Sequence, residues 1–409
     1  MFTLKTIPTR MRPLGALASP PYRCELEYLK STGAQYYLFA GKSINGIDCW
    51  VAPEKTTSSI NNAVGIWNNG SRADSITYQS FQSRGFTVCS AGGLGFNGQQ
   101  IRTGLGNALR HVIVSGTSVT VDDYSATLQI GWRGGGILQD YFALFGCYNT
   151  STDSVDTQSC QIGPCKLYSG QSLVCDLIPV LDWDGNAKMY DRMTQSYPPH
   201  YGTFDAGPEI WPVEYIGSTG TEYIDTGILG TPTLRLECDA AFSPSSANNY
   251  IGQSFDITLG TLQNRFTFGI FAQSGSWYAG LGDTNSTAFV AADDSRHVFS
   301  LDAPSKLFKI DGSTIFTIGF TSWNESPTPI GGLALFGRKL TNSGGVSPFA
   351  IMRVWRSKIY DNGVLVRDYK PIRVGSGTTW QGALLDEVNR KVYRNAGMGA
   401  FTYGADVIN

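Results

Sequence analysis

Several classes of protein are excluded by what this chain has little of. Charged residues make up only 16% of its 409 residues, the formal net charge is -2, and no long run of Lys or Arg occurs. Because nucleic-acid binding depends on basic patches that neutralise phosphates, we expect no nucleic-acid partner. No apolar segment reaches the ~18 residues of a membrane-spanning helix, so we expect no membrane partner either.

The beginning of the chain lacks the apolar stretch of an export signal. Pro8, Arg10, Arg12 and Pro13 interrupt the apolar residues before these reach the ~7 residues that a secretory signal needs. We therefore expect the protein to be made, and to fold, in a cytoplasm.

What the chain does contain is a repeat. The phrase EYLKSTGAQYY at Glu27–Tyr37 returns as EYIGSTGTEYI at Glu214–Ile224. Further matches follow in the same order, namely Cys49 with Cys238, RHV at 110–112 with RHV at 296–298, ALFG at 143–146 with ALFG at 334–337, and KLYSGQSLVCDLIP from Lys166 with KIYDNGVLVRDYKP from Lys358. The constant order indicates a tandem duplication, with an arm at 1–21, a first domain at 22–207 and a second at 209–409.

The cysteines are distributed unevenly between the two repeats. Only one of the eight, Cys238, lies in the second repeat. Since a disulfide framework would normally serve both copies, we interpret them mainly as free thiols packed within strands. Cys160 and Cys165 are close enough in sequence that a local disulfide between them stays open.

Short strands and tight turns dominate both repeats. In TLRLECDAAF, at 233–242, apolar residues alternate with polar ones, as on a half-buried strand. Asp311-Gly312 and Asn362-Gly363 suit two-residue hairpin turns. The segment ALLDEVNRKVYRN from Ala383 could form a helix or a further hairpin. The pattern predicts an all-β protein of two tandem antiparallel β-sandwich domains.

A family resemblance supports this interpretation. The segment RHVFSLDAPSKLFKIDGSTIF at 296–316 resembles the central signature of laminin-G-like and concanavalin A-like jelly rolls. The repeated opening phrase and the closing segment that begins KIYDNGVLVRDYKP resemble a subgroup found in tailed-phage virion proteins and gut bacterial surface proteins. The resemblance spans both repeats and implies a jelly-roll fold, but it specifies activity poorly.

Four tryptophans are candidate sugar-binding residues. Trp67, Trp132, Trp277 and Trp323 lie in Gly-, Asn- or Ser-rich stretches rather than in clear strands. Exposed aromatic rings near amides and carboxylates are typical of carbohydrate sites. Because tryptophans in loops also cover the ends of hydrophobic cores, a structural role stays open for them.

Acidic residues offer little support for catalysis. A glycoside hydrolase needs two carboxylates about 5 to 9.5 Å apart across a cleft. The strand segment LECDAAF offers Glu237 and Asp239 without a third acid, and we assign this pair to a solvated strand face. Asp182 and Asp184 in LDWDGN are candidate ligands for calcium, which prefers loop oxygens, although Asp-x-Asp-Gly is also ordinary turn chemistry. We expect no enzyme and no obligatory cofactor.

Two of the three histidines, His111 and His297, are matched by the repeat alignment. No serine or cysteine nucleophile elbow lies near either of them, so we interpret both as structural. The matched Ser-Thr-Gly of the opening phrase predicts that each domain begins with a hairpin, with a turn at Gly33 and at Gly220.

The N-terminal arm matches neither repeat. Its Phe2, Lys5, Arg10 and Arg12 lie among prolines, a composition that suits an extended segment docked on another protein or packed back on its own domain. These features favour a non-enzymatic structural protein of a phage virion surface, either capsid decoration, head fibre or tail-associated, in a homo-oligomer or larger assembly and able to bind glycans. A bacterial surface or secreted carbohydrate-binding protein is the alternative, and a glycoside hydrolase is a third hypothesis.

Overall fold

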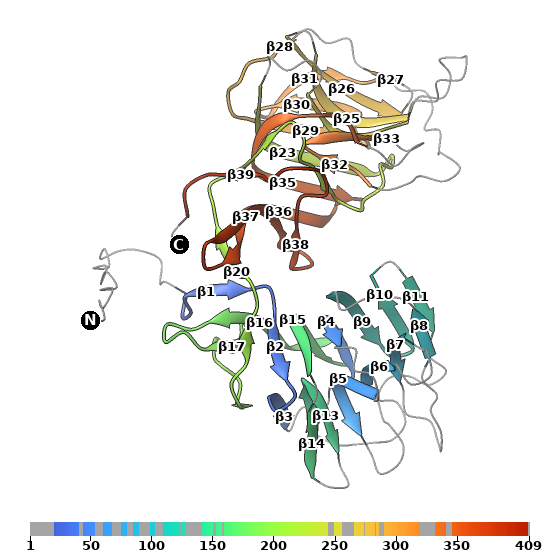
Figure 1. Cartoon of the computed structure of the whole chain (residues 1–409). Helices are drawn as coiled ribbons and strands as arrows, with labels where there is room; N and C mark the ends of the chain where they lie inside the picture. The colour runs from blue at the N-terminus through green and yellow to red at the C-terminus, as the bar shows by residue number, and fades with distance from the viewer. Residues whose placement is uncertain are drawn as a thin grey trace, which may run out of the picture. The chain divides into compact units, whose positions relative to one another are not determined.

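The computed structural model describes residues 20–40, 44–53, 60–67, 75–79, 85–89, 99–102, 109–122, 124–127, 141–149, 153–157, 159–243, 249–255, 266–273, 275–282, 284–285, 290–319, 332–340 and 346–407. Every regular element within these ranges is a β-strand, so the all-β prediction is confirmed. The chain divides into two compact units (Figure 1), unit 1 ending at Gly207 and unit 2 spanning Pro208–Val407.

Unit 1 contains two groups of paired strands. The first comprises β1 (Cys24–Leu26), β2 (Leu29–Thr32), β4 (Gly46–Pro53), β9 (Arg110–Ser115), β10 (Ser118–Val121), β11 (Tyr124–Thr127), β15 (Ser159–Ser169), β16 (Ser172–Leu181), β17 (Ala187–Asp191) and β19 (Asp205–Ala206). The second comprises β3 (Tyr36–Ala40), β5 (Ile60–Trp67), β6 (Ser75–Gln79), β7 (Gly85–Cys89), β8 (Gln99–Arg102), β12 (Tyr141–Leu144), β13 (Gly146–Asn149), β14 (Ser154–Thr157) and β18 (His200–Tyr201).

Unit 2 repeats this organisation. Its first group comprises β20 (Glu209–Pro212), β21 (Ile216–Thr219), β23 (Leu234–Phe242), β29 (His297–Asp302), β30 (Leu307–Ile310), β31 (Ser313–Thr317), β35 (Ile351–Asp361), β36 (Val364–Ser376), β37 (Thr379–Asp386), β38 (Lys391–Tyr393) and β39 (Thr402–Tyr403). Its second comprises β24 (Asn249–Phe255), β25 (Phe266–Gln273), β26 (Ser276–Gly282), β27 (Thr284–Asn285), β28 (Val290–Ala291), β33 (Gly337–Leu340) and β34 (Val346–Phe349), beside the pair β22 (Ile224–Asp225) and β32 (Ala334–Leu335).

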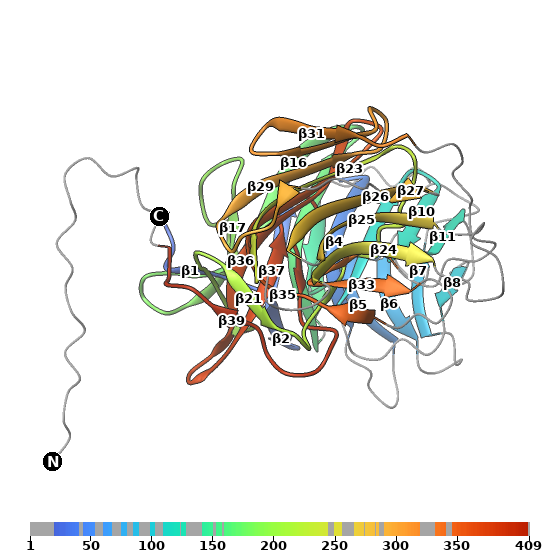
Figure 2. The same cartoon turned by 90° about the horizontal axis from the view of Figure 1, so that it is seen from above.

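Both units are built mainly from antiparallel pairs. Among the described strand pairs within each unit, only β13 with β5 in unit 1 and β24 with β33 in unit 2 run parallel. Figure 2 shows β24, β25, β26 and β33 side by side in unit 2. The single parallel pair therefore recurs in both copies, as expected for two units descended from one fold.

The core of unit 2 lies between its two groups of strands. Phe242 on β23 and Phe299 on β29 belong to the first group, and both contact the ring of Trp277 on β26, with centroids 5.0 and 4.8 Å apart. All three side chains are buried. Alternate residues of β23 point into this core, in agreement with the alternation in TLRLECDAAF. Unit 2 is therefore sandwich-like.

The predicted hairpins are present. Asp311 and Gly312 have φ of 50° and 78° between β30 and β31, and Asn362 and Gly363 have φ of 48° and 78° between β35 and β36. These positive φ values are the ones that Asp-Gly and Asn-Gly adopt at low cost. The segment from Ala383 forms the hairpin of β37 and β38 rather than a helix.

The opening phrase of each repeat forms a corner between strand groups, so the prediction of a first hairpin is wrong. β2 pairs with β15 and β19, whereas β3 pairs with β12 and β18. In unit 2, β21 pairs with β35 and β39, whereas β22 pairs with β32. Gly33 and Gly220, with φ of 103° and 107°, allow the chain to change from one group to the other.

A side chain, not a partner strand, closes each corner. Gln35 Oε1 accepts hydrogen bonds from Ser31 Oγ at 3.0 Å and Thr32 N at 2.9 Å. In unit 2 the same Ser-Thr-Gly turn is closed by the buried carboxylate of Glu222. Glutamine and glutamate can replace each other here because both present an acceptor oxygen at the same place.

A buried aspartate secures a second turn in both units. Asp191 Oδ1 accepts the N–H of Asp176 at 3.1 Å, and Asp386 Oδ1 accepts the N–H of Asp368 at 2.9 Å. Asp191 Oδ1 also accepts the N–H of Met193 at 3.0 Å, and Asp386 Oδ1 also accepts the N–H of Val388 at 3.1 Å. These acids are used to satisfy buried backbone donors, which would otherwise cost stability.

Candidate functional site

The two matched histidines do not occupy equivalent positions. On the neighbouring strand the matched Cys49 and Cys238 lie opposite Val112 and Phe299, so Val112 corresponds to Phe299. This register places Arg110, not His111, at the position of His297. The equivalence predicted from the RHV triplets is therefore wrong by one residue, because alternating burial fixes strand register more strongly than identical letters do.

Each histidine has a structural role of its own. His111 stacks on Trp50, with ring centroids 4.7 Å apart, and its Nε2 lies 2.6 Å from Asp48 Oδ1. His297 lies between two carboxylates, with Nδ1 2.7 Å from Asp311 Oδ2 and Nε2 3.0 Å from Asp293 Oδ1. Burial alone would lower the pKa of His297, but the two hydrogen bonds outweigh it and raise the pKa.

The candidate calcium ligands belong to an ordinary turn. Asp182 accepts hydrogen bonds from the N–H groups of Asp184 and Asn186 at 3.0 and 2.8 Å, and Lys188 Nζ lies 2.6 Å from its Oδ2. The lysine occupies the place that a cation would need. Within the described ranges, no group of three or more His, Cys, Asp or Glu side chains is arranged to hold a metal ion.

Of the tryptophans and arm residues that the sequence predicts to be functional, only the side chain of Trp277 lies among the described residues. Trp277 is only 1% exposed and lies within β26, so its placement in an exposed loop is wrong. Gly275 and Ser276 beside it belong to the hairpin that joins β25 to β26. The side chain of Trp67, all of Trp132 and Trp323, and the arm residues Phe2, Lys5, Arg10 and Arg12 lie outside the described residues. Cys160 and Cys165, left open as a disulfide, are both buried thiols and are not joined to each other.

A different tryptophan occupies the outer face of unit 2. Asp239 on β23 pairs with Arg356 on β35, and the next residue, Ala240, pairs with Val354. Trp355 is therefore the extra residue of a β-bulge, a feature that re-aims a side chain at the surface of a sheet. Its indole is partly exposed and lies 5.4 Å from the ring of Tyr215.

Two arginines flank this indole. The guanidinium of Arg296 lies 4.7 Å from the Trp355 ring centroid and makes two hydrogen bonds of 2.7 Å with Asp239. The guanidinium of Arg353 lies 5.6 Å from the ring centroids of both Trp355 and Tyr215. We call Tyr215, Asp239, Arg296, Arg353 and Trp355 the Trp355 patch.

Arg353 differs from the other arginines around it. Arg296 pairs with Asp239, Arg356 pairs with Asp368, and Arg235 lies 3.4 Å from Glu237. Arg353 is exposed and, among the residues that the structure describes, contacts rings rather than a carboxylate. Its hydrogen-bond donors are thus available to an external acceptor.

An intramolecular stack elsewhere in unit 2 shows the contrasting arrangement. Arg373 lies 4.0 Å from the ring centroid of Trp380 and 5.5 Å from that of Trp211, and it makes hydrogen bonds of 2.6 and 2.8 Å with Asp406. Asp406 already satisfies this guanidinium. The stack therefore holds neighbouring strands together, and we do not regard it as a binding site.

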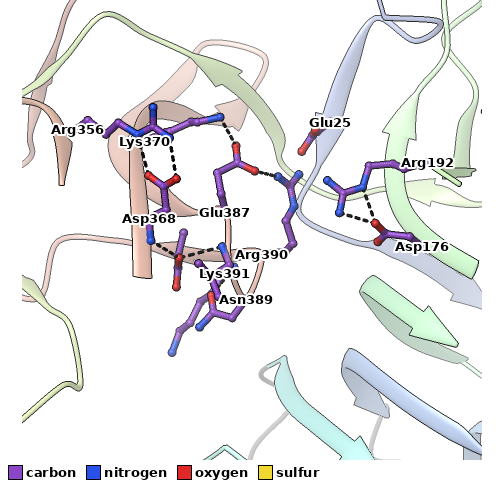
Figure 3. A network of polar contacts seen from close by, with 12 residues as sticks. Glu25, Asp176, Arg192, Arg356, Asp368, Lys370, Glu387, Asn389, Arg390 and Lys391 are labelled. Carbon is purple, nitrogen blue, oxygen red and sulfur yellow. Dashed lines mark hydrogen bonds and ion pairs between the residues drawn. The ribbon is translucent and has the colours of Figure 1, made fainter. Parts of the chain in front are cut away.

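The acids around the β37–β38 turn are likewise engaged by cations. Figure 3 shows Asp368 facing Arg356, with hydrogen bonds of 2.8 and 2.7 Å. Glu387 faces Lys370 at 3.0 Å and also pairs with Arg390. Burial would raise the pKa of Glu387, but these cations outweigh it and lower the pKa. The network stabilises the turn. Burial raises the pKa of Asp386, whose Oδ1 accepts the backbone N–H groups of Asp368 and Val388.

The patch is specific to the second repeat. Counted from the matched Lys166 and Lys358, the counterparts of Arg353, Trp355 and Arg356 are Gln161, Gly163 and Pro164. A Cβ on Gly163 would lie 2.9 Å from Trp50 Cβ, because Trp50 fills this part of unit 1 and is only 8% exposed. The shared scaffold thus carries a closed surface in unit 1 and an open aromatic and cationic surface in unit 2.

The residues of the patch could have been found by comparing the repeats. The motif KLYSGQSL or KIYDNGVL is matched, but the residues just before it change from QIGPC to RVWRS. A change from small or neutral residues to Trp and Arg beside an unchanged strand is a signal of altered surface chemistry. The prediction considered only tryptophans outside clear strands, so it did not include Trp355, which lies within β35.

Comparisons with known proteins leave the family open. No protein-family model matches the chain, and no curated protein is significantly similar to it. Across the described ranges, no helix is long and apolar enough to span a membrane.

Proposed function

We propose that this chain is a non-enzymatic structural protein of a tailed-phage virion surface, either capsid decoration, head fibre or tail-associated. Its two units are proposed to be tandem jelly rolls of the laminin-G-like and concanavalin A-like type. They face outward and bind glycans on a host or in its surroundings. The sequence resemblance supports the assignment to phage particles, and the sandwich-like all-β units support the architecture.

The observation that carries the non-enzymatic part is the use of the acids. Glu222, Asp191 and Asp386 close turns, and Asp239 holds Arg296. A glycoside hydrolase would need one carboxylate free to attack and a second free to donate a proton. Carboxylates that accept backbone N–H groups or pair with arginine are used for stability instead.

Assembly is assigned to the N-terminal arm and recognition to the units. In this proposal Phe2, Lys5, Arg10 and Arg12 contact a neighbouring virion protein, within a homo-oligomer or a larger assembly. Removing residues 1–19, which leaves Pro21 and its hydrogen bond from Tyr197 in place, should leave thermal unfolding of both units unchanged but prevent incorporation of the protein into particles. Incorporation of the truncated chain at the normal level would exclude this role for the arm.

Purified particles provide the test of location. Phage particles isolated by density gradient should contain peptides of both units in mass spectrometry, and antibodies against the chain should label intact particles. A chain found only in the soluble fraction of lysed host cells would overturn the proposal. A glycan array with the isolated protein tests binding separately from location.

A further inference from the structure

The Trp355 patch combines three features that seldom occur together on a surface designed only for solubility. It presents a half-exposed indole, a neighbouring phenol ring and a guanidinium without a carboxylate partner among the described residues. Aromatic rings supply flat apolar contact area, which suits the faces of sugar rings. Arginine supplies a planar fork of donors that matches carboxylate, sulfate or phosphate oxygens.

Charge also selects the ligand. The surrounding strand face carries five cations, Arg235, Arg296, Arg353, Arg356 and Lys358. Three of the arginines are paired with acids, through Glu237, Asp239 and Asp368. Because Arg353 lies beside Trp355 and pairs with no carboxylate among the described residues, the patch complements an anionic ligand better than a neutral one.

The rings prepare Arg353 for binding. Its guanidinium lies 5.6 Å from the ring centroids of both Tyr215 and Trp355, and a Cβ on the neighbouring Gly217 would lie 3.3 Å from its Cγ. A side chain already restricted in this way loses less conformational entropy when it binds. The bulge that exposes Trp355 and the contacts that restrict Arg353 therefore act on the same small surface.

We propose that this patch binds an anionic oligosaccharide, with Arg353 taking the carboxylate, sulfate or phosphate of one sugar while Trp355 and Tyr215 pack against sugar rings. The inference rests on the glycan-binding part of the proposed function and adds a ligand class and a site to it. The shared chemistry is an anionic group on a carbohydrate, and an array that displays uronate, sialate, sulfate and phosphate forms separates its possible sources.

The test uses the full-length protein. An array of acidic oligosaccharides is screened beside their neutral counterparts, and the best acidic binder is titrated by calorimetry against the wild type and R353Q. We expect about a tenfold or greater loss of affinity in R353Q, since it loses a charge-assisted hydrogen bond. R353K, which keeps the charge but loses the planar fork, should bind with intermediate affinity. Binding should also weaken as salt increases.

Controls separate binding from folding and from location. R192Q removes a guanidinium from unit 1, where Arg192 pairs with Asp176, and should bind like the wild type. R353Q should also have the same melting temperature as the wild type, because Arg353 is exposed. W355G installs the residue found in unit 1 and should lose binding as R353Q does. If it unfolds, R353Q alone decides.

Four results would overturn the inference: no binding to any acidic oligosaccharide, equal binding to the neutral counterparts, unchanged affinity of R353Q, or stronger binding of a single-stranded oligothymidylate than of any saccharide. These results do not affect whether the chain is found in virions. Conversely, absence from purified particles together with R353-dependent saccharide binding would refute the proposed location and leave this site standing.

Discussion

His297 in unit 2 occupies the position that Arg110 occupies in unit 1. Arg110 Nη1 lies 3.1 Å from Asp122 Oδ2, and His297 Nδ1 lies 2.7 Å from Asp311 Oδ2. Both aspartates lead a two-residue turn and have positive φ, of 54° and 50°. The two repeats therefore keep one ion pair but build it from a cation that titrates near neutral pH in unit 2 and from one that does not in unit 1.

This exchange predicts a pH dependence that H297R removes. Since the folded-state pKa of His297 is raised above its ordinary value of 6.5, its contribution to stability is complete below that value. The contribution is lost as pH rises through the folded-state pKa. Thermal unfolding from about pH 5 to 9 should show this loss in the wild type but not in H297R. Equal losses in both proteins would contradict the assignment, and the NMR titration of His297 should move to lower pH in D311N.

Glu222 should affect stability in the acidic range. Burial would raise its pKa, but hydrogen bonds from Thr219 and Thr221 outweigh that effect and lower the pKa. Its contribution is therefore present above the unfolded-state value and lost as pH falls through the folded-state pKa. E222Q should cost about 1 kcal/mol at neutral pH, because the amide keeps the acceptor oxygen, as Gln35 does, but loses the charge.

The difference between the wild type and E222Q should shrink as the pH falls through the folded-state pKa of Glu222, which lies below its ordinary value. Chemical unfolding of both proteins at several pH values measures it. E214Q, which neutralises an exposed glutamate of the same phrase, is the matched control and should not show this convergence. A difference for E222Q that stays constant with pH would contradict the prediction.

Gly163 should tolerate no side chain. A Cβ there would lie 2.9 Å from Trp50 Cβ and 3.0 Å from the carbonyl oxygen of Glu27. G163A should therefore lower the free energy of unfolding by about 1–3 kcal/mol, as overpacking does. G319A is the control, because no atom lies within 4 Å of a Cβ at that glycine. Denaturant unfolding of both variants measures this difference. Equal free energies of unfolding for G163A and G319A would show that Gly163 is not closely packed against Trp50.

Two phenylalanines in matched turns carry backbone strain. Phe145 and Phe336 have φ of 64° and 66° and are buried, and their rings lie 4.6 and 4.7 Å from those of Phe204 and Phe401. F336A and F336G remove the same packing, but glycine also relieves the strain. F336G should therefore be more stable than F336A by about 1 kcal/mol. The opposite order in denaturant unfolding would show that the backbone relaxes at this position.

Local rules recovered much of the fold from the sequence. Asp311-Gly312 and Asn362-Gly363 specify their turns through positive φ, and alternation in TLRLECDAAF specifies which face is buried. The corner at Ser-Thr-Gly was misjudged because its closing residue is Gln35 in one copy and Glu222 in the other. A comparison that counts only identical residues does not show that Gln35 and Glu222 supply the same acceptor oxygen.

The candidate site was harder to predict for a physical reason. Flanking Gly and Ser residues gave Trp277 a loop-like context, yet packing against Phe242 and Phe299 buries it. Trp355 lies in a strand that reads as scaffold, and the bulge opposite Asp239 places both Trp355 and Arg356 on the outer face. Bulges arise from the pairing of two distant segments, so a single segment does not reveal them.

The central claim is that both units supply a common scaffold while the outer face of unit 2 carries recognition on the surface of a phage particle. Cryo-electron microscopy of intact particles tests it most directly. We expect density for both units on the particle exterior, with Trp355 and Arg353 facing solvent. A map without this chain, or one in which another virion protein covers Arg353, would contradict it.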